Sequence, residues 1–291
     1  LSLIPLVSTM QRSVIRKIPQ AKLGGAEPNP GWFGTKGNEP SNPAWTNPNW
    51  LKSRFHFSFA EYSNSRNMAF GVLRVMNDDL VQPNRGFGAH PHRDVEICTY
   101  VVEGKLTHQD SMGTEETLGR GSIQFMTAGT GVTHSEHNLD VRSPLRFIQI
   151  WINTRQRGLK PNYGSMVGDA AAATARRNKW AHLVADVQNK DVDTPIKINQ
   201  DANIFVSELS GDQTLTYTVS ENRQAYFLCM EGDVELQAAG LSKEVLNRHD
   251  AAELYGPLEV QVKAQREGAH VLVVDCLLYT SPSPRDRGNH L

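Results

Sequence analysis

The chain has 291 residues, and its 30 lysines and arginines almost balance its 31 aspartates and glutamates, giving a formal net charge of −1. This balance excludes the basic surface that direct nucleic-acid binding or attachment to anionic membranes requires. No apolar run reaches the roughly 18 residues of a membrane-spanning helix. The three cysteines, Cys98, Cys229 and Cys276, are widely spaced and odd in number, which favours a reducing compartment, the cytoplasm, over a disulfide framework.

Both ends of the chain differ in character from the rest. Residues 1–9 precede Met10 and lack the charged leader of a secretory signal, so we interpret them as sequence upstream of the true start. The segment CLLYTSPSPRD, which begins at Cys276, resembles the conceptual translation of a sequencing adapter. We therefore expect residues 276–291 to be an artefact and the native chain to end shortly after Asp275, which leaves two genuine cysteines.

The first half of the chain is predicted to consist of strands. Residues 23–51 are rich in Gly, Pro, Asn and Trp, a composition typical of loops. Runs rich in Val, Ile, Phe, Tyr and Thr follow, separated by turn residues, and each is typical of a strand: 54–60, 68–76, 94–104, 122–129 and 145–153.

The second half repeats this pattern after a different segment. Residues 169–186 are Ala-rich and contain good helix formers, which predicts a short helix within a linker. Strand-like runs then resume at 203–211, 214–220, 224–238, 258–264 and 270–275. Many short strands at this spacing indicate an all-β fold of two tandem antiparallel β-barrels joined by a short linker helix.

A short internal echo supports the tandem arrangement. The strand Tyr100–Gly104 and the strand Tyr226–Gly232 are both apolar and both end in Glu-Gly. We therefore expect the chain to divide as follows: an N-terminal extension, 1–22; a metal-binding domain, 23–155; a linker, 156–200; and a second domain, 201–275.

Two pairs of polar residues carry the predicted chemistry. His90 and His92 are two residues apart, and His134 and Glu136 repeat that spacing. Alternate side chains of an extended segment point to one face, so each pair can reach a single ion. Two such pairs on facing strands predict a mononuclear site with three nitrogen ligands and one oxygen ligand.

The pattern favours an open, reactive metal site. A single histidine in a strand is usually hydrogen-bonded or exposed, but two paired segments flanked by glycines are difficult to explain by packing. The glycines Gly86, Gly88, Gly129 and Gly131 allow close backbone approach beside a buried site. A structural zinc site would be closed and rich in thiolates, whereas four ligands of this kind leave positions of an octahedral ion for water, substrate or dioxygen.

Several other polar residues are secondary candidates. Glu96 lies four residues after His92 and would share its face on a continuous strand, as a fifth ligand or a residue that orients a ligand. Asn138 is a candidate for orienting a ligand, and His137 should point away from the site. The remaining histidines are expected in the core, at the rim or isolated: His56, His108, His182, His249 and His270. The second domain therefore has no metal site that the sequence reveals.

At these residues the chain resembles the pirin family of the cupin superfamily, specifically its quercetin dioxygenases. The resemblance is carried by residues 55–62 (FHFSFAEY), 71–79 (GVLRVMNDD), 86–104 (GFGAHPHRDVEICTYVVEG), 108–113 (HQDSMG), 126–138 (MTAGTGVTHSEHN) and 149–153 (QIWIN). Carried over by position, the family's iron ligands fall on His90, His92, His134 and Glu136. Asn84 and Thr127 depart from the general cupin motifs but follow the pirin pattern. The resemblance implies a bicupin whose C-terminal barrel has lost its metal.

The resemblance implies two alternative functions. In the first, the chain is a dioxygenase that opens a flavonol such as quercetin with dioxygen, Glu136 being the base that takes the 3-hydroxyl proton. Candidate apolar walls of that pocket, from their place in the sequence, are Phe87, Phe125 and Met126. In the second, the chain is a non-enzymatic, iron-binding, redox-responsive co-regulator of transcription that acts through protein contacts, in the nucleus as well as the cytoplasm.

The ligands do not select the ion. A site with three nitrogens and one oxygen accepts Fe, Mn, Co, Ni, Cu or Zn, and affinity alone favours copper over iron. Fe(II) is the ion that the resemblance implies. The physiological substrate stays open, and nothing in the sequence requires more than a monomer.

Overall fold

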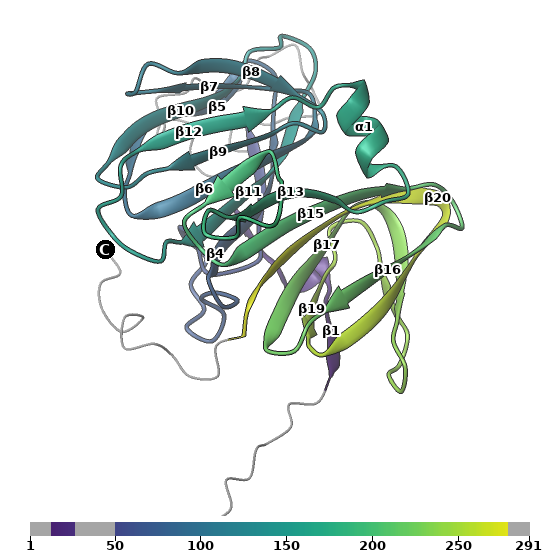
Figure 1. Ribbon diagram of the computed structural model, residues 1–291. Coiled ribbons are helices and arrows are strands. Elements are labelled where there is room, and N and C mark those ends of the chain that lie inside the picture. Colours follow the sequence, from purple (N-terminus) through teal and green to yellow (C-terminus); the bar gives the residue numbers. More distant parts are fainter. Residues whose placement is uncertain (1–12, 27–49, 279–291) are drawn as a thin grey trace, which may run out of the picture.

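The computed structural model describes residues 13–26 and 50–278, and these residues form two β domains side by side (Figure 1). The expected upstream segment 1–9, residues 279–291 of the expected artefact 276–291, and most of the expected loop region 23–51 lie outside the described residues. The only α-helix of the described residues is α1 (Ala170–Arg176), and a short 3-10 helix spans Gln20–Lys22. The expected all-β, two-domain cupin fold is confirmed.

The N-terminal domain consists of two sheets. The strands of the seven-stranded sheet are, in spatial order, β12 (Asn162–Met166), β9 (Ile123–Thr127), β6 (Val95–Glu103), β11 (Leu145–Asn153), β4 (Leu73–Val81), β3 (Leu51–Phe55) and β2 (Gly24–Ala26). Those of the four-stranded sheet are β5 (Arg85–His92), β10 (Val132–Asn138), β7 (Lys105–Asp110) and β8 (Glu115–Gly119).

The C-terminal domain is one nine-stranded sheet that bends around its own core. Its main path runs through β1 (Val14–Ile18), β19 (Ala251–Tyr255), β17 (Arg223–Gln237), β20 (Leu258–Leu277), β15 (Ala202–Leu209), β13 (Ala181–Asp186) and β14 (Ile196–Ile198). Two more strands branch from it, β16 (Thr214–Val219) beside β20 and β18 (Glu244–Leu246) beside β17. Among the described residues these pairings form open sheets and no closed barrel.

The first strand of the chain belongs to the second domain. Strand β1, drawn in purple in Figure 1, pairs antiparallel with β19, so that Val14 lies opposite Tyr255. The side chain of Lys17 forms an ion pair with Asp250 at 3.0 Å. The part of the expected N-terminal extension that the structure describes is therefore an edge strand of the C-terminal sheet.

The expected linker is divided between the two sheets. Strand β12 pairs with β9 in the N-terminal domain, whereas β13 and β14 belong to the C-terminal sheet. The helix predicted over 169–186 is correct only in its first half. Asp169 caps α1 by accepting the Ala172 N–H at 2.9 Å, and the helix ends at Arg176 because Arg177 already takes an extended conformation.

The last two expected strands are a single long one. Strand β20 continues from Leu258 to Leu277, and register shifts in its partner β17 at Cys229/Glu231 and Gly232/Val234 accommodate its bend. Cys276, expected to begin the artefact, is buried within this strand. The echo between the two halves has a structural counterpart, because Gly104 and Gly232 both have positive φ and both approach a neighbouring backbone closely.

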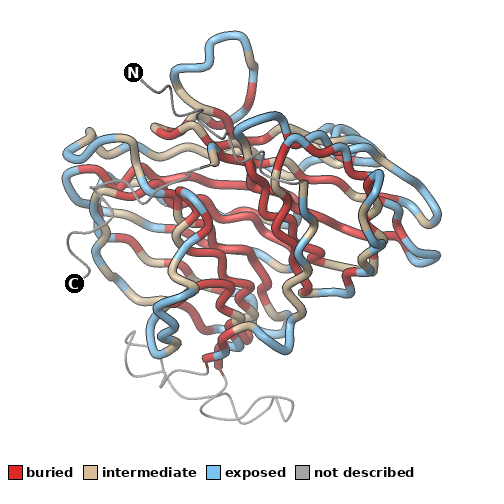
Figure 2. Tube along the Cα trace, turned by 90° about the horizontal axis from the view of Figure 1, so that it is seen from below, coloured by how far each residue is buried: buried red, intermediate tan, exposed pale blue. Residues whose placement is uncertain are grey.

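The core joins the two domains. Alternate side chains of β6, among them Cys98, Tyr100 and Val102, point out of the N-terminal domain and pack with apolar residues of the second domain such as Ile204 and Leu272. Figure 2 shows buried residues following the strands through the middle of the molecule. No helix within the described ranges is long and apolar enough to cross a membrane.

A buried ionic cluster also crosses the domain boundary. Arg146 on β11 donates two hydrogen bonds to Asp78 on β4, both at 2.8 Å. His249, from the loop before β19, contacts the same carboxylate at 2.5 Å through Nδ1. Burial would raise the pKa of Asp78, but Arg146 and His249 outweigh it and hold that pKa well below its usual range. His249 therefore links the C-terminal domain to the buried ion pair of the N-terminal domain by a hydrogen bond to the Asp78 carboxylate.

Candidate metal centre

Two neighbouring antiparallel strands carry the four predicted residues, of which the three histidines form one possible metal-binding group and Glu136 belongs to another. In the pairing of β5 with β10, His134 lies opposite His90, and Val132 lies opposite His92. The register shifts between His134 and Glu136, so that Glu136 lies opposite Phe87. Residues 132, 134, 136 and 138 of β10 are all buried, as the period of an extended strand requires.

Three imidazole rings converge at this place. The ring centroids of His90, His92 and His134 lie 4.5 to 4.9 Å from one another. The Nε2 atoms of His90 and His134 are 3.1 Å apart. One nitrogen from each of the three rings lies within 4.8 Å of the other two, the arrangement of a group that could hold one metal ion.

The protonation of these rings suits ligand donation. Burial, followed by the neighbouring imidazoles, lowers the pKa of His92 and of His134 to about 3, so both rings are neutral at pH 7. His90 lies 2.7 Å, through Nδ1, from the carbonyl oxygen of Gly88. A neutral ring that donates from Nδ1 has its lone pair on Nε2, and that atom faces the other histidines.

The carboxylate of Glu136 is buried and held by amides. Gln124 donates to Oε1 at 2.9 Å, and Gln149 donates to Oε2 at 2.7 Å. Thr99 lies 3.2 Å from Oε1 but only 2.7 Å from the amide oxygen of Gln149. A hydroxyl has one hydrogen, so Thr99 is better placed to bond Gln149, which turns the amide N–H of that residue toward Glu136.

The polar residues around Glu136 lie between two apolar clusters. Along the inner face of β6, Thr99 separates Ile97 from Val101, which belong to different clusters. Gln149 occupies the same kind of position on β11, between Phe147 and Trp151. Sequence reasoning missed both residues. The signal that could have found them is a single polar residue among the inward-facing, otherwise apolar positions of a strand.

His108 lies closer to the site than the sequence indicated. It forms a second possible metal-binding group with His134 and Glu136, in which the ligand atoms again lie within 4.8 Å of one another. Its Nε2 is 3.0 Å from Asp110, and its ring stacks on Tyr163 with centroids 4.6 Å apart. The pairing of β10 with β7 places it opposite Glu136, a register that the sequence does not state.

Two secondary candidates lie elsewhere. Glu96 points to the opposite face of β6, where it accepts hydrogen bonds from Thr127 at 2.8 Å and Asn199 at 3.1 Å. The prediction that it shares the ligand face was wrong. Asn138 donates to the carbonyl oxygen of Ser143 at 2.9 Å and so organises the turn after β10 rather than a ligand.

The expected apolar walls are partly corrected. Met126 belongs to the inner cluster of the N-terminal domain, and Phe87 packs against Trp50 with ring centroids 5.5 Å apart. Phe125 instead faces the second domain as part of the shared core. Trp151, which sequence reasoning did not select, lies with its ring centroid 4.8 Å from that of His92.

The C-terminal domain offers no comparable group. Within the part of the chain that the structure describes, clusters of three or more potential ligands occur only among the residues named above. His182 pairs with Asn203 at 3.0 Å, and His270 pairs with Glu231 at 3.1 Å. His249 belongs to the cluster around Asp78. None of these three histidines belongs to a described group of three mutually close ligands, although His270 also lies 3.6 Å from Glu208.

Comparison with known proteins identifies both domains. Residues 39–152 match the Pirin family, and residues 187–276 match the family described as the quercetinase C-terminal cupin domain. A pirin-like protein of Caulobacter vibrioides is 37% identical over 227 residues, which cover 77% of this chain and 92% of that protein. A quercetin 2,3-dioxygenase of Escherichia coli is also 37% identical, over 67% of this chain and 81% of that enzyme.

A solved structure shares the whole architecture. The bacterial pirin YhhW of Escherichia coli, in complex with nickel(II), superposes with a TM-score of 0.72 at 27% identity. The match covers 91% of this chain and all of that one. The similarity therefore extends across both domains, including the domain that carries the convergent histidines.

Proposed function

Because this chain belongs to the pirin family of bicupins, we propose that it is a metal-dependent dioxygenase that cleaves flavonols, of the quercetin 2,3-dioxygenase type. The observation that carries the proposal is the convergence of three imidazoles beside a buried carboxylate. Relatives named quercetin 2,3-dioxygenase support the substrate class, and the nickel complex of YhhW supports a divalent ion.

In this proposal the ion is held by His90, His92, His134 and Glu136. The donor types fit, because His90, His92 and His134 form one possible metal-binding group, and the carboxylate of Glu136 lies within 4.8 Å of a ligand atom of His134 in a second group. Fe(II) is the proposed ion, with Ni, Cu, Mn, Co or Zn as the alternatives that the donor set accepts. When bound, such an ion supplies Lewis acidity and a template for a flavonol and dioxygen.

Glu136 is also the proposed base. Its Oε2 accepts one hydrogen bond, from Gln149, and a carboxylate oxygen can accept two. We assign the proton of the flavonol 3-hydroxyl to this oxygen. The amides of Gln149 and Gln124 hold the carboxylate in one orientation. The apolar clusters on either side of these residues limit water around the carboxylate.

The decisive experiment combines reconstitution with turnover. Protein is loaded with Fe(II) under anaerobic conditions, quercetin is added, and oxygen is then admitted while the flavonol absorbance is followed. We expect oxygen-dependent loss of that absorbance, abolished in His92→Ala and Glu136→Gln. Metal content is measured on each variant, so that a lost ion is distinguished from a lost base.

Two matched variants provide the controls. Glu96→Gln makes the same change as Glu136→Gln on the outer face of the sheet, and His182→Ala removes a histidine from the other domain. Both should retain turnover. If the metal-replete protein leaves quercetin untouched, the dioxygenase proposal fails, and a non-enzymatic, redox-responsive protein partner becomes the better hypothesis.

A further inference from the structure

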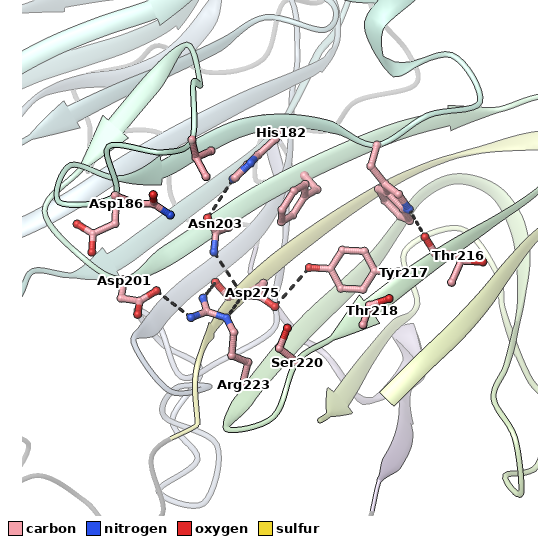
Figure 3. A pocket seen from close by; sticks show the side chains of 14 residues that line it. His182, Asp186, Asp201, Asn203, Thr216, Tyr217, Thr218, Ser220, Arg223 and Asp275 are labelled. Carbon is pink, nitrogen blue, oxygen red and sulfur yellow. Dashed lines mark hydrogen bonds and ion pairs between the residues drawn. The ribbon is translucent and has the colours of Figure 1, made fainter. Parts of the chain in front are cut away.

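A pocket of about 580 Å³ lies in the C-terminal domain, away from the convergent histidines (Figure 3). It is lined by β13, β15 and β16, by the start of β17 and the end of β20, and by the loop between β13 and β14. Its volume falls within the range of about 300–1,000 Å³ that small-molecule sites occupy. The family's proposed metal chemistry makes no use of it.

One wall of the pocket is a row of rings. His182 stacks on Phe205 with centroids 4.1 Å apart and an interplanar angle of 23°. Phe205 meets Tyr217 edge to face at 5.7 Å, and Tyr217 meets Trp180 edge to face at 5.2 Å. Trp180 is fixed in turn by donating from Nε1 to the carbonyl oxygen of Thr216 at 2.9 Å. These mutual contacts hold the rings in place before any ligand arrives.

The opposite end of the pocket is polar and already ordered. Arg223 donates from Nη1 to Asp201 at 2.9 Å and from Nε to Asp275 at 2.5 Å. Asn203 and Tyr217 both donate to Asp275, each at 3.4 Å. Figure 3 shows Arg223 between the two carboxylates, with the hydroxyl of Tyr217 directed toward Asp275.

One carboxylate of this pocket is open to a ligand. Asp186 is paired outside the lining with Arg155 at 2.5 Å, and Asp275 is buried against Arg223. Asp201 also bonds Arg223, but its side chain is 36% exposed and can contact a ligand. The ammonium of Lys197, beside the pocket, donates to the carbonyl oxygens of two lining residues, Asn189 and Val192. His182 adds no positive charge, because burial lowers its pKa and leaves the ring neutral at pH 7.

We propose that this pocket binds a small organic cation, an ammonium-bearing molecule, at a site separate from the metal centre. A desolvated cation is attracted by the faces of aromatic rings and by the exposed carboxylate of Asp201. The positive group of the lining, Arg223, is already engaged by two carboxylates. Ring wall and carboxylate together therefore select a positive charge on an apolar body.

The test uses a pair of probes that differ in charge. Choline carries a trimethylammonium group, and 3,3-dimethyl-1-butanol has the same shape without the charge. Each is titrated into the full-length protein by isothermal calorimetry at low salt. We expect saturable choline binding and about tenfold weaker binding of the neutral alcohol, as a cation–π and carboxylate contact implies. Equal binding of the two probes, or no saturable choline binding up to tens of millimolar, would overturn the proposal.

Variants localise the binding. Asp201→Asn keeps the shape and the acceptor for Arg223 while removing the charge, and it should weaken choline about fivefold or more. Trp180→Leu removes one ring and should weaken both probes. Glu115→Gln, on the exposed outer strand of the other domain, removes the same charge and should change nothing. Circular dichroism melts check that each variant folds. Unchanged choline affinity in folded Asp201→Asn would contradict the site.

Discussion

The two domains share an architecture but differ in what their inner faces carry. In the N-terminal domain, polar residues interrupt the apolar inner face, and Thr99, Gln149 and Glu136 lie between two apolar clusters. In the C-terminal domain, the corresponding interior is a continuous apolar cluster that includes Phe227, Cys229 and Val273. Its polar residues gather instead in the pocket around Arg223.

This difference shows how one fold supports two kinds of site. In a strand, alternate side chains face inward whatever their type. The same fold can therefore place either metal ligands or apolar packing residues at these positions. Polar residues in the interior of the N-terminal domain are tolerated because they hydrogen-bond one another, as Gln124 and Gln149 do with Glu136. A glutamine or glutamate placed in the apolar cluster of the second domain would have no hydrogen-bond partner there, and its burial would destabilise the fold.

The largest expected effect tests where the metal binds. His134→Ala removes the imidazole that is common to both possible ligand groups, and we expect the bound metal to fall from one ion per chain to near zero. Metal analysis after loading and desalting measures this. His182→Ala, in the second domain, should keep full occupancy. An equal loss of bound metal in both variants would contradict a metal site confined to the N-terminal domain.

The next effect concerns the link between the domains. Arg146→Met leaves Asp78 buried without its bidentate partner, and we expect it to lower the free energy of unfolding by about 3–5 kcal/mol. Urea denaturation followed by circular dichroism measures the change. Arg248→Met, at an exposed position beside His249, should stay within about 0.5 kcal/mol of the parent protein.

Loss of a residue that orients the Glu136 carboxylate is expected to lower metal affinity less than loss of a ligand. Gln149→Leu removes the donor to Oε2 of Glu136, and metal affinity should fall about 10- to 100-fold. Competition with a chelator of known affinity gives the ratio. Gln261→Leu, an exposed glutamine of β20, serves as the control. An unchanged affinity in Gln149→Leu would mean that Glu136 is not a ligand or needs no orientation.

A smaller effect is a dependence of stability on pH at the domain boundary. Burial would raise the pKa of Glu231, but His270 and Arg120 outweigh it and lower the pKa to about 2. The unfolded chain binds this proton near the ordinary value of 4.5. The stabilisation is therefore complete above that value and is lost as the pH falls toward 2. Thermal melts between pH 6 and 3 should show a shallower decline for Glu231→Gln.

The smallest expected effect is on the three cysteines, two in the core between the domains and one inside the second domain. Burial raises the pKa of Cys98 and of Cys229 well above the usual range, and it raises that of Cys276 to about 11. None of these thiols should react with a thiol reagent at pH 8 unless the protein is unfolded. Rapid labelling of the native protein would show that one of them is accessible.

The sequence by itself determined the fold class and the residues that converge. A period of two in apolar strands and the paired spacing of His90 with His92 and of His134 with Glu136 are local properties, and they persist in the folded chain because an extended strand enforces them. The position of Met126 on the inner face follows from the same rule.

Tertiary structure alone decided which strands are neighbours and which face of each strand is turned inward. The register of β10 against β7 brings His108 beside Glu136, and the packing of the second domain on β6 turns Glu96 and Phe125 outward to that interface. The bridge between Arg177 and Glu208 of β15 ends a helix that composition alone would have continued. Strand register and domain packing depend on contacts between segments far apart in the chain, and a local pattern carries no information about such contacts.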